Sequence, residues 1–388
     1  MNVLEFCKNC LNSRFKTHND LKKYKLSNKF SSFSKKGFCN VCLYELKKKN
    51  IDWDKRTTTL KKIVKFYKNK TSKSYQCIVP VSGGKDSLRQ AIYVRDKLKL
   101  KALLVSCSWP PEQSNNIGPK NLENLVSLGF DCINLTLNPN MWKDLMRHSF
   151  FEFGNIFRAS EMALFAIPIH FAIQYKIPLI FYGENPFYTV VHGSKEEGVG
   201  GDASKIQEMN TIKGGPKSLK FRINKKNSNE FYFYNYPNYK DMKKNSLKLV
   251  YLGYYIKNWY GKINGKIAIN RGLLLRKDKP INTGDLWGIS ALDEDFKIVN
   301  QYLKFLKLGI GHVTDQVCES INLKEISRKK GKSLVEKYDG KCSKKYINKF
   351  CKYINITNKE FDKTVNKFVN KKLFKKIGNN WIRKFDYN

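Results

Sequence analysis

Pro80-Val81-Ser82-Gly83-Gly84-Lys85-Asp86-Ser87 joins an apolar run, residues 75–79, to residues 88–98, whose apolar positions recur at helical spacing. This order predicts a short buried strand, a tight turn and a helix. The glycine pair lets backbone N–H groups approach a ligand, and the helix adds the positive end of its dipole. The serine hydroxyls and the lysine ammonium add donors for an anion. The stretch therefore predicts a phosphate-binding loop, with a plain glycine turn before a capped helix as the alternative.

Further strands and helices alternate along the chain after this loop. The predicted strands are residues 101–107, 132–137 and 177–182, and the predicted helices are residues 121–129, 141–148 and 157–175. Such alternation predicts an α/β fold, a doubly wound parallel sheet covered by helices on both faces. Ligands bind such sheets at the carboxyl ends of the strands. We therefore expect residues 82–87, 107–109 and 183–185 to meet at one edge.

Two Cys-x-x-Cys pairs lie near the start of the chain, Cys7 with Cys10 and Cys39 with Cys42. Four thiolates in two such pairs are typical of a structural zinc site, in which the protein fills every metal position. Two unrelated pairs of buried cysteines are the alternative. A redox role is not favoured, because neither pair has the strand-to-helix context of a thioredoxin motif. We expect a zinc knuckle within residues 1–50.

The composition limits the classes of partner. Of 388 residues, 73 are Lys or Arg and 33 are Asp or Glu, which gives a net charge of +40. Such a charge can serve nucleic-acid binding. However, only 11 of the basic residues are arginine, and the lysines are spread along the chain among asparagines. We therefore do not expect nucleic acid as the substrate. No apolar run approaches the length of a membrane span, so we expect a cytoplasmic protein with reduced cysteines.

Several further motifs occur in a fixed order and resemble one enzyme family. The chain is similar to the N-acetyl sugar amidotransferases of surface-polysaccharide and flagellin-glycan biosynthesis, which belong to the PP-loop ATP pyrophosphatases. The resemblance runs from about Cys7 to Phe368. It rests on the two cysteine pairs, Asp52-Trp53-Asp54-Lys55-Arg56, the Ser82–Ser87 loop, Gly183-Glu184-Asn185-Pro186, Leu252-Gly253-Tyr254-Tyr255 and Thr314-Asp315-Gln316-Val317-Cys318-Glu319.

This resemblance implies a domain organisation. Residues 51–75 would form a linking helix between the zinc knuckle and the PP-loop ATP pyrophosphatase domain, residues 76–320. Residues 190–245 lack periodicity and would supply a substrate loop. Residues 321–388 are very basic, and we expect them to form a helical C-terminal region.

The resemblance also implies a reaction and its residues. The substrate would be an N-acetylated, acidic sugar, either a nucleotide sugar or a nonulosonic acid. Its acetamido oxygen would attack ATP, pyrophosphate would leave, and ammonia would then displace AMP to give an acetamidino group. The resemblance assigns the phosphates to Ser82, Gly83, Gly84, Lys85, Asp86 and Ser87, with Asp86 also holding Mg²⁺. Glu184 and Asn185, next to Gly183, are candidates for orienting the substrate or deprotonating ammonium. Asp315 is a candidate for a second polar wall.

Ammonia would come from separate proteins. Residue 2 is Asn, whereas an N-terminal-nucleophile glutaminase needs cysteine there, and Cys318 lacks the glycine-flanked elbow of a triad glutaminase. In the family that the chain resembles, the partners are glutaminase and cyclase-like subunits. We therefore expect ammonia-delivering partners.

Two other functions remain open on the sequence. A PP-loop enzyme that thiolates or aminates tRNA would share the loop, the cysteine pairs and the basic charge. Thiolation usually needs another cysteine pair near the cleft, and Cys107 and Cys132 lie far apart in sequence. A scaffold that only binds ATP is the third reading, which the complete Ser82–Ser87 motif disfavours.

Overall fold

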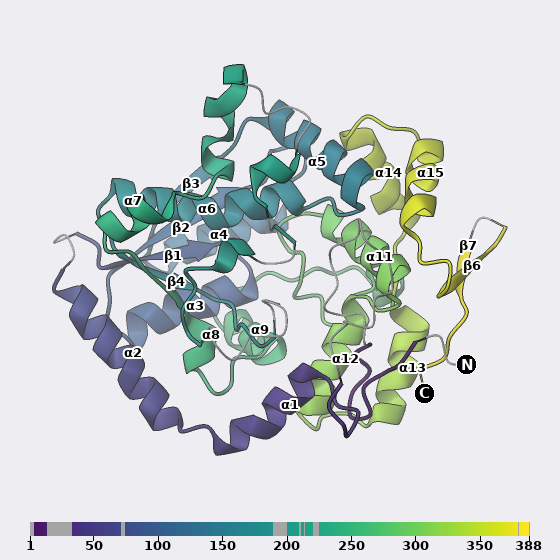
Figure 1. Ribbon diagram of the computed structural model, residues 1–388, viewed down its shortest axis with the longest axis horizontal. Helices are drawn as coiled ribbons and strands as arrows, with labels where there is room; N and C mark the ends of the chain where they lie inside the picture. Colours follow the sequence, from purple (N-terminus) through teal and green to yellow (C-terminus); the bar gives the residue numbers. More distant parts are fainter. Residues whose placement is uncertain are drawn as a thin grey trace.

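A five-stranded parallel sheet forms the centre of the protein (Figure 1). The computed structural model describes residues 4–13, 33–70, 74–188, 200–208, 211–212, 214–219, 225–378 and 380–387. The sheet order is β3-β2-β1-β4-β5. The strands are β1 (Cys77–Val81), β2 (Ala102–Ser108), β3 (Asp131–Thr136), β4 (Leu179–Tyr182) and β5 (Lys248–Tyr251). The α/β class and four predicted strands are confirmed, whereas β5 is a further strand that no sequence pattern predicts.

The winding of the chain reverses between β1 and β4, which pair side by side through Ile78 and Ile180. From β1 the chain proceeds outward to β2 and β3, and it then returns to place β4 and β5 on the other side of β1. In such sheets the crevice beyond the carboxyl ends of the strands at the reversal is the usual ligand site. The loop after β1 and the turn after β4 both lie at this point.

Helices cover both faces of the sheet. On one face α2 (Trp53–Lys68), α3 (Lys85–Asp96), α4 (Ile117–Ser127) and α9 (Gly261–Ile269) pack on one buried cluster of strand side chains. On the other face α5 (Pro139–Phe153) and α6 (Arg158–Gln174) pack on a second cluster. Successive residues of β1 alternate between the two, because Ile78 belongs to one cluster and Val79 to the other.

Shorter elements join these layers. They are α1 (Asn40–Lys47), η2 (Lys48–Asn50), η4 (Ile206–Glu208), η5 (Pro216–Leu219), η6 (Lys225–Tyr234), α7 (Tyr239–Lys244), α8 (Leu252–Tyr255) and α10 (Pro280–Thr283). The predicted substrate loop, residues 190–245, lies partly outside the described residues.

A helical unit follows the sheet and packs beside its carboxyl edge (Figure 1). It consists of α11 (Phe296–Leu308), α12 (His312–Asn322), α13 (Arg328–Tyr338), α14 (Lys344–Tyr353) and α15 (Asn358–Phe368). The hairpin of β6 (Phe374–Ile377) and β7 (Asn380–Arg383) then corrects the expectation that residues 321–388 are only helical. In β6 only Phe374 is buried, so lysine-rich strands of this kind give little periodic signal.

The described N-terminal segment, residues 4–13, packs against the described C-terminal residues 380–387 (Figure 1). The rings of Phe6 and Tyr387 lie 4.8 Å apart, and those of Phe6 and Phe385 lie 5.8 Å apart. The segments that carry the cysteine pairs contact α12. Within the described parts of the chain, no helix combines the length and the apolar character that crossing a membrane requires.

Candidate active site at the carboxyl edge of the sheet

A cavity of about 700 Å³ lies beyond the carboxyl ends of β1 and β4, between the sheet and the C-terminal helices. Its walls come from the Ser82–Ser87 loop, the turn after β4, α9, α11 and α12. Among its lining residues are Ser82, Lys85, Asp86, Ser87, Gly183, Glu184, Asn185, Asn264, Asp315 and Glu319. Side chains that the sequence analysis selects from three separate segments therefore share one pocket.

The loop after β1 has a backbone conformation that requires glycine. Gly83 has a φ of +77°, and a Cβ atom there would lie 3.0 Å from the backbone nitrogen of Leu122. Gly84 is the N-cap residue of α3, and its N–H points to the Ser82 hydroxyl at 3.4 Å. The Ser87 hydroxyl donates to the Gly84 carbonyl at 3.0 Å. These bonds shape the loop at the positive end of α3, as an anion cradle needs.

Lys85 and Asp86 form an ion pair at the pocket wall, with Lys85 Nζ 2.9 Å from Asp86 Oδ2. Burial alone would lower the pKa of Lys85, but Asp86, Glu319 and Asp285 outweigh it and hold this pKa above its usual value. The Asp86 side chain is 47% exposed. Its carboxylate has lone pairs left for another ligand, since each oxygen offers two acceptor sites.

Asp86 is oriented by two residues that the sequence analysis does not select for any role, Asn264 and Arg89. Asn264 Nδ2 donates to Asp86 Oδ1 at 2.6 Å, and the Arg89 guanidinium donates to Asn264 Oδ1. Arg89 is buried and also donates to the Asn258 carbonyl at 2.8 Å. This chain of bonds fixes the first turn of α3 to α9. Asn264 lies in no recognisable motif, so only the fold reveals its place.

Glu184 follows β4 and lines the pocket. Its Oε2 atom is buried and has no hydrogen-bond partner among the described residues. Burial raises the pKa of Glu184 to about 7, and the nearby charge of Asp86 contributes to the rise. A carboxyl group with this pKa can exchange a proton at neutral pH.

Gly183 and Asn185, the neighbours of Glu184, serve the local backbone. Asn185 is buried, its amide donates to the Gly253 carbonyl at 3.0 Å, and its Oδ1 accepts from the Phe187 N–H at 3.1 Å. A Cβ atom at Gly183 would lie 2.5 Å from the side-chain oxygen of Gln90. Both residues thus shape the turn that presents Glu184.

Asp315 and His312 lie on the first turn of α12 and line the pocket. Asp315 forms an ion pair with Lys304 of α11, with 2.6 Å between Oδ2 and Nζ. Burial lowers the pKa of His312, although Asp285 and Asp315 oppose the shift. The start of α12 is held by Asp339, whose carboxylate accepts from the Gly311 N–H at 2.7 Å.

Glu319, one turn further along α12, joins this helix to α9. Its two carboxylate oxygens accept from the N–H groups of Gly261 at 2.9 Å and Lys262 at 2.7 Å. A carboxylate at a helix N-terminus is favourable, because it satisfies free N–H groups and the helix dipole. Glu319 therefore fixes the distance between two pocket walls.

The four predicted cysteine ligands, Cys7, Cys10, Cys39 and Cys42, meet in one cluster. All four sulfur atoms lie within 4.8 Å of one another, with Cys7 and Cys42 3.8 Å apart and Cys10 and Cys39 3.7 Å apart. Sulfur atoms on a zinc tetrahedron with Zn–S bonds of about 2.3 Å are roughly 3.8 Å apart. The Cys39 N–H donates to Cys7 Sγ at 3.2 Å, as is common around metal thiolates. The cluster can therefore hold a structural metal ion and could bind zinc.

The cysteine cluster contacts α12 on the side of the pocket. The Leu11 N–H points to Cys318 Sγ at 3.3 Å. The Asn9 amide donates to Cys42 Sγ at 3.3 Å and to Asn322 Oδ1 at 3.0 Å. Cys318 and Asn322 both line the pocket. The cysteine cluster therefore lies behind the part of the pocket wall that α12 forms.

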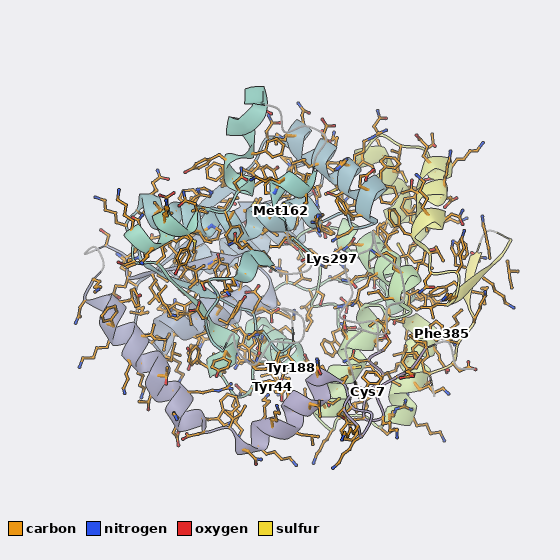
Figure 2. All side chains as sticks on the ribbon, in the orientation of Figure 1. Cys7, Tyr44, Met162, Tyr188, Lys297 and Phe385 are labelled. Carbon is orange, nitrogen blue, oxygen red and sulfur yellow. The ribbon has the colours of Figure 1, made fainter. Side chains whose placement is uncertain are left out.

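Next to this cluster, α1 and η2 bring a buried ionic group to the pocket rim. Lys48 donates to the hydroxyls of Tyr188 at 3.1 Å and Tyr260 at 2.6 Å. Both tyrosines donate to the carboxylate of Glu45. Burial lowers the pKa of Lys48 to about 8, and Glu45 opposes this. Tyr188 also contacts Tyr44 of α1, with 5.3 Å between the ring centres, and Figure 2 labels both residues.

Comparison with known proteins concerns the C-terminal part of the chain. Residues 292–385 match the family model of the C-terminal domain of WbpG-like LPS biosynthesis proteins. This stretch contains α11 and α12, and hence one wall of the pocket. The match shows that this part of the chain is similar to LPS biosynthesis proteins. No curated protein matches the sequence.

Proposed function

We propose that the chain is an ATP-dependent amidotransferase that converts the acetamido group of an N-acetylated, acidic sugar into an acetamidino group during LPS biosynthesis. One observation carries this proposal. The Ser82–Ser87 loop and the domain matching LPS biosynthesis proteins line the same cavity. A phosphate-type loop supplies a site for ATP, and the facing domain supplies a site for a precursor of the polysaccharide.

The loop after β1 binds the β- and γ-phosphates of ATP. The N–H groups at the start of α3 and the serine hydroxyls donate to phosphate oxygens. Lys85 turns from Asp86 to the phosphates, because three negative oxygens attract the ammonium more strongly than one carboxylate. The charge that develops on departing pyrophosphate is thereby neutralised.

Asp86 would hold Mg²⁺, directly or through water. Its half-exposed carboxylate at the pocket wall is the ligand type that Mg²⁺ prefers. When bound, the ion neutralises phosphate charge and orients the α-phosphate. Asn264 and Arg89 keep the carboxylate in place while Lys85 changes its partner.

The reaction needs two displacements. The acetamido oxygen attacks the α-phosphorus of ATP, the bond to the β-phosphate oxygen breaks, and pyrophosphate leaves. Ammonia then adds to the carbon of the O-adenylyl imidate, and AMP leaves with the former acetamido oxygen. Adenylation is necessary because an amide oxygen is a poor leaving group, whereas AMP is a good one.

Glu184 takes the proton from ammonium before or during the attack on the imidate. Its buried Oε2 has no partner among the described residues, and its pKa of about 7 suits a proton acceptor at neutral pH. Asp315, tied to Lys304, forms the second polar wall. Glutaminase and cyclase-like partner subunits supply the ammonia in the cytoplasm, and zinc in the cysteine cluster has a structural role.

A tRNA-thiolating function fits the pocket less well. Cys107 lines the pocket, but burial raises its pKa to about 12, so its thiol stays protonated at neutral pH. Cys132 lies on β3 and pairs in register with Leu104, three residues before Cys107. The two strands therefore do not set these thiols opposite each other.

The experiment is pyrophosphate release from Mg·ATP and ammonium, with N-acetylated nucleotide sugars compared with bulk tRNA. We expect release with a sugar and none with tRNA, and loss of release in Lys85→Met. Release only with tRNA would overturn the substrate assignment. A rate unchanged in Lys85→Met would overturn the role of the loop.

A further inference from the structure

One face of α11 is polar and half-buried. Lys297, Asn300, Gln301 and Lys304 recur at spacings of three and four residues, and all four line the pocket. The opposite face, including Val299 and Leu303, is buried in the core. A helix that places polar residues in a cavity has a wall suited to a polar ligand.

The lysines of this wall differ in their partners. Lys304 is paired with Asp315, and the buried Lys307 donates to the Gly154 carbonyl at the end of α5. Lys297 has no ion pair within the described residues, and its ammonium lies 5.2 Å from the centre of the Phe157 ring. Figure 2 shows Lys297 between α6, marked by Met162, and the C-terminal helices. Lys297 is therefore the lysine of this wall that remains available to an anion.

The pocket that Lys297 lines also holds buried side-chain oxygens without hydrogen-bond partners among the described residues. Gln301 Oε1 on α11, Glu161 Oε2 on α6 and Thr211 Oγ1 are buried, and none has a hydrogen-bond partner among the described residues. All three residues line the pocket. An unsatisfied buried acceptor is costly, so these oxygens favour a ligand rich in hydroxyl and N–H donors.

We propose that Lys297 and Gln301 form the acceptor subsite, in which Lys297 binds an anionic substituent of the sugar and Gln301 accepts from its acetamido N–H or a hydroxyl. This inference rests on the proposed function and names the residues that select its substrate. It assigns α11 to the sugar rather than to ATP, because α11 belongs to the matched LPS domain and the phosphate loop does not. Both residues determine specificity and take no part in bond making.

Calorimetric titration with a matched pair of sugar nucleotides tests this subsite. The probes are UDP-N-acetylglucosamine and the uronic acid made by oxidising its C6 carbon, which differ in one carboxylate. We expect the wild type to bind the uronic acid about tenfold more tightly, as one charge-assisted hydrogen bond allows. Lys297→Gln removes this preference by weakening only the uronic acid. Gln301→Met weakens both sugars, and neither variant changes the affinity for Mg·ATP.

The control is Lys337→Gln on α13. Lys337 lies 5.2 Å from the centre of the Tyr338 ring, the same distance as Lys297 from Phe157, but it does not line the pocket. We expect this variant to keep the preference and the melting temperature. Equal binding of both sugars by the wild type, or weaker Mg·ATP binding in Lys297→Gln, would overturn the inference. If the wild type binds the uronic acid selectively but releases no pyrophosphate, the subsite is supported and the proposed reaction is wrong.

Discussion

Asn264 Nδ2 lies 2.6 Å from Asp86 Oδ1. This hydrogen bond connects α9 to the first turn of α3 across a sequence separation of 178 residues. The partner of Asn264 on its other side is Arg89, which is buried. Asp86 is therefore held from outside its own loop. This arrangement holds one carboxylate at the pocket wall independently of its ion pair with Lys85.

The variant Asn264→Ala tests this arrangement. We expect pyrophosphate release to fall by about tenfold to a hundredfold, because Asp86 loses its orienting donor. Raising the Mg²⁺ concentration should restore part of the rate. Asn270→Ala, at the exposed end of the same helix, is the control and should match the wild type. A full rate in Asn264→Ala at low Mg²⁺ would contradict the role of this bond.

Glu184 should make the stability of the apo protein depend on pH. The pKa of Glu184 in the folded state is about 7, above the usual 4.5. As pH rises, the unfolded state therefore loses this proton at a lower pH than the folded state does. The contribution of Glu184 to stability is thus intact below pH 4.5, declines as pH rises and is fully lost above about 7. The free energy of unfolding of Glu184→Gln minus that of the wild type should therefore be larger at pH 8 than at pH 4.5.

Urea unfolding at the two pH values measures this difference. Glu123→Gln, an exposed position on α4, serves as the control and should change nothing. The same Glu184→Gln variant should lose the rise of amidination rate with pH that an ionised base produces. A pH-independent difference in unfolding free energy from the wild type would show that Glu184 titrates normally.

Loss of the metal should loosen α1 and α12 and leave the central sheet intact. Cys42→Ser removes one of the four candidate ligands. The Asn9 amide, which donates to both Cys42 Sγ and Asn322 Oδ1, then loses its sulfur acceptor. We expect zinc content to fall and hydrogen exchange to rise in residues 39–48 and 312–322. Protection in β1 and β2 should persist.

Cys342→Ser is the matched control, since this free cysteine lies outside the cluster. It should retain the metal and the exchange pattern of the wild type. If α12 keeps its full protection from hydrogen exchange in metal-free Cys42→Ser protein, metal binding does not stabilise the pocket wall, and the prediction is wrong.

The carboxylate of Asp339 should stabilise the fold through α12. It is buried and accepts from the Gly311 N–H at 2.7 Å, the Val313 N–H at 3.0 Å and the Thr314 hydroxyl at 2.6 Å. Removing a helix cap of this kind leaves buried donors unpaired, so Asp339→Ala should cost about 3 kcal/mol in urea unfolding. Asp54→Ala, an exposed first-turn position of α2, should change stability little. A cost for Asp339→Ala as small as that of the control would contradict the account.

The sequence predicts those parts of the molecule whose signals are local. The glycine pair of the Ser82–Ser87 loop, the apolar strands β1 to β4 and the two cysteine pairs each carry a pattern within a few residues. The four residues of β5 follow a long stretch without periodicity, and their strand character depends on pairing with β4. In the hairpin, β6 is lysine-rich and buries only Phe374, so it lacks alternation.

Pocket residues supplied by distant elements escape sequence reasoning for a similar reason. Asn264 and Lys297 are ordinary polar residues on helices, and their sequence context does not differ from that of a solvent-exposed helix. Glu319 ends the Thr314–Glu319 motif, but the sequence does not predict its role. Only the packing of α9, α11 and α12 at the carboxyl edge of the sheet brings them to the phosphate loop. The same packing gives Asn185 a backbone role that its position beside Glu184 does not reveal.

The transfer of a labelled oxygen tests the central claim most directly. The acceptor sugar is prepared with oxygen-18 in its acetamido group and incubated with Mg·ATP and ammonium, and the products are weighed by mass spectrometry. We predict that the label appears in AMP and that the sugar gains an NH group in place of the oxygen. Label that remains in the sugar, or cleavage of ATP to ADP, would contradict adenylation of the acetamido group.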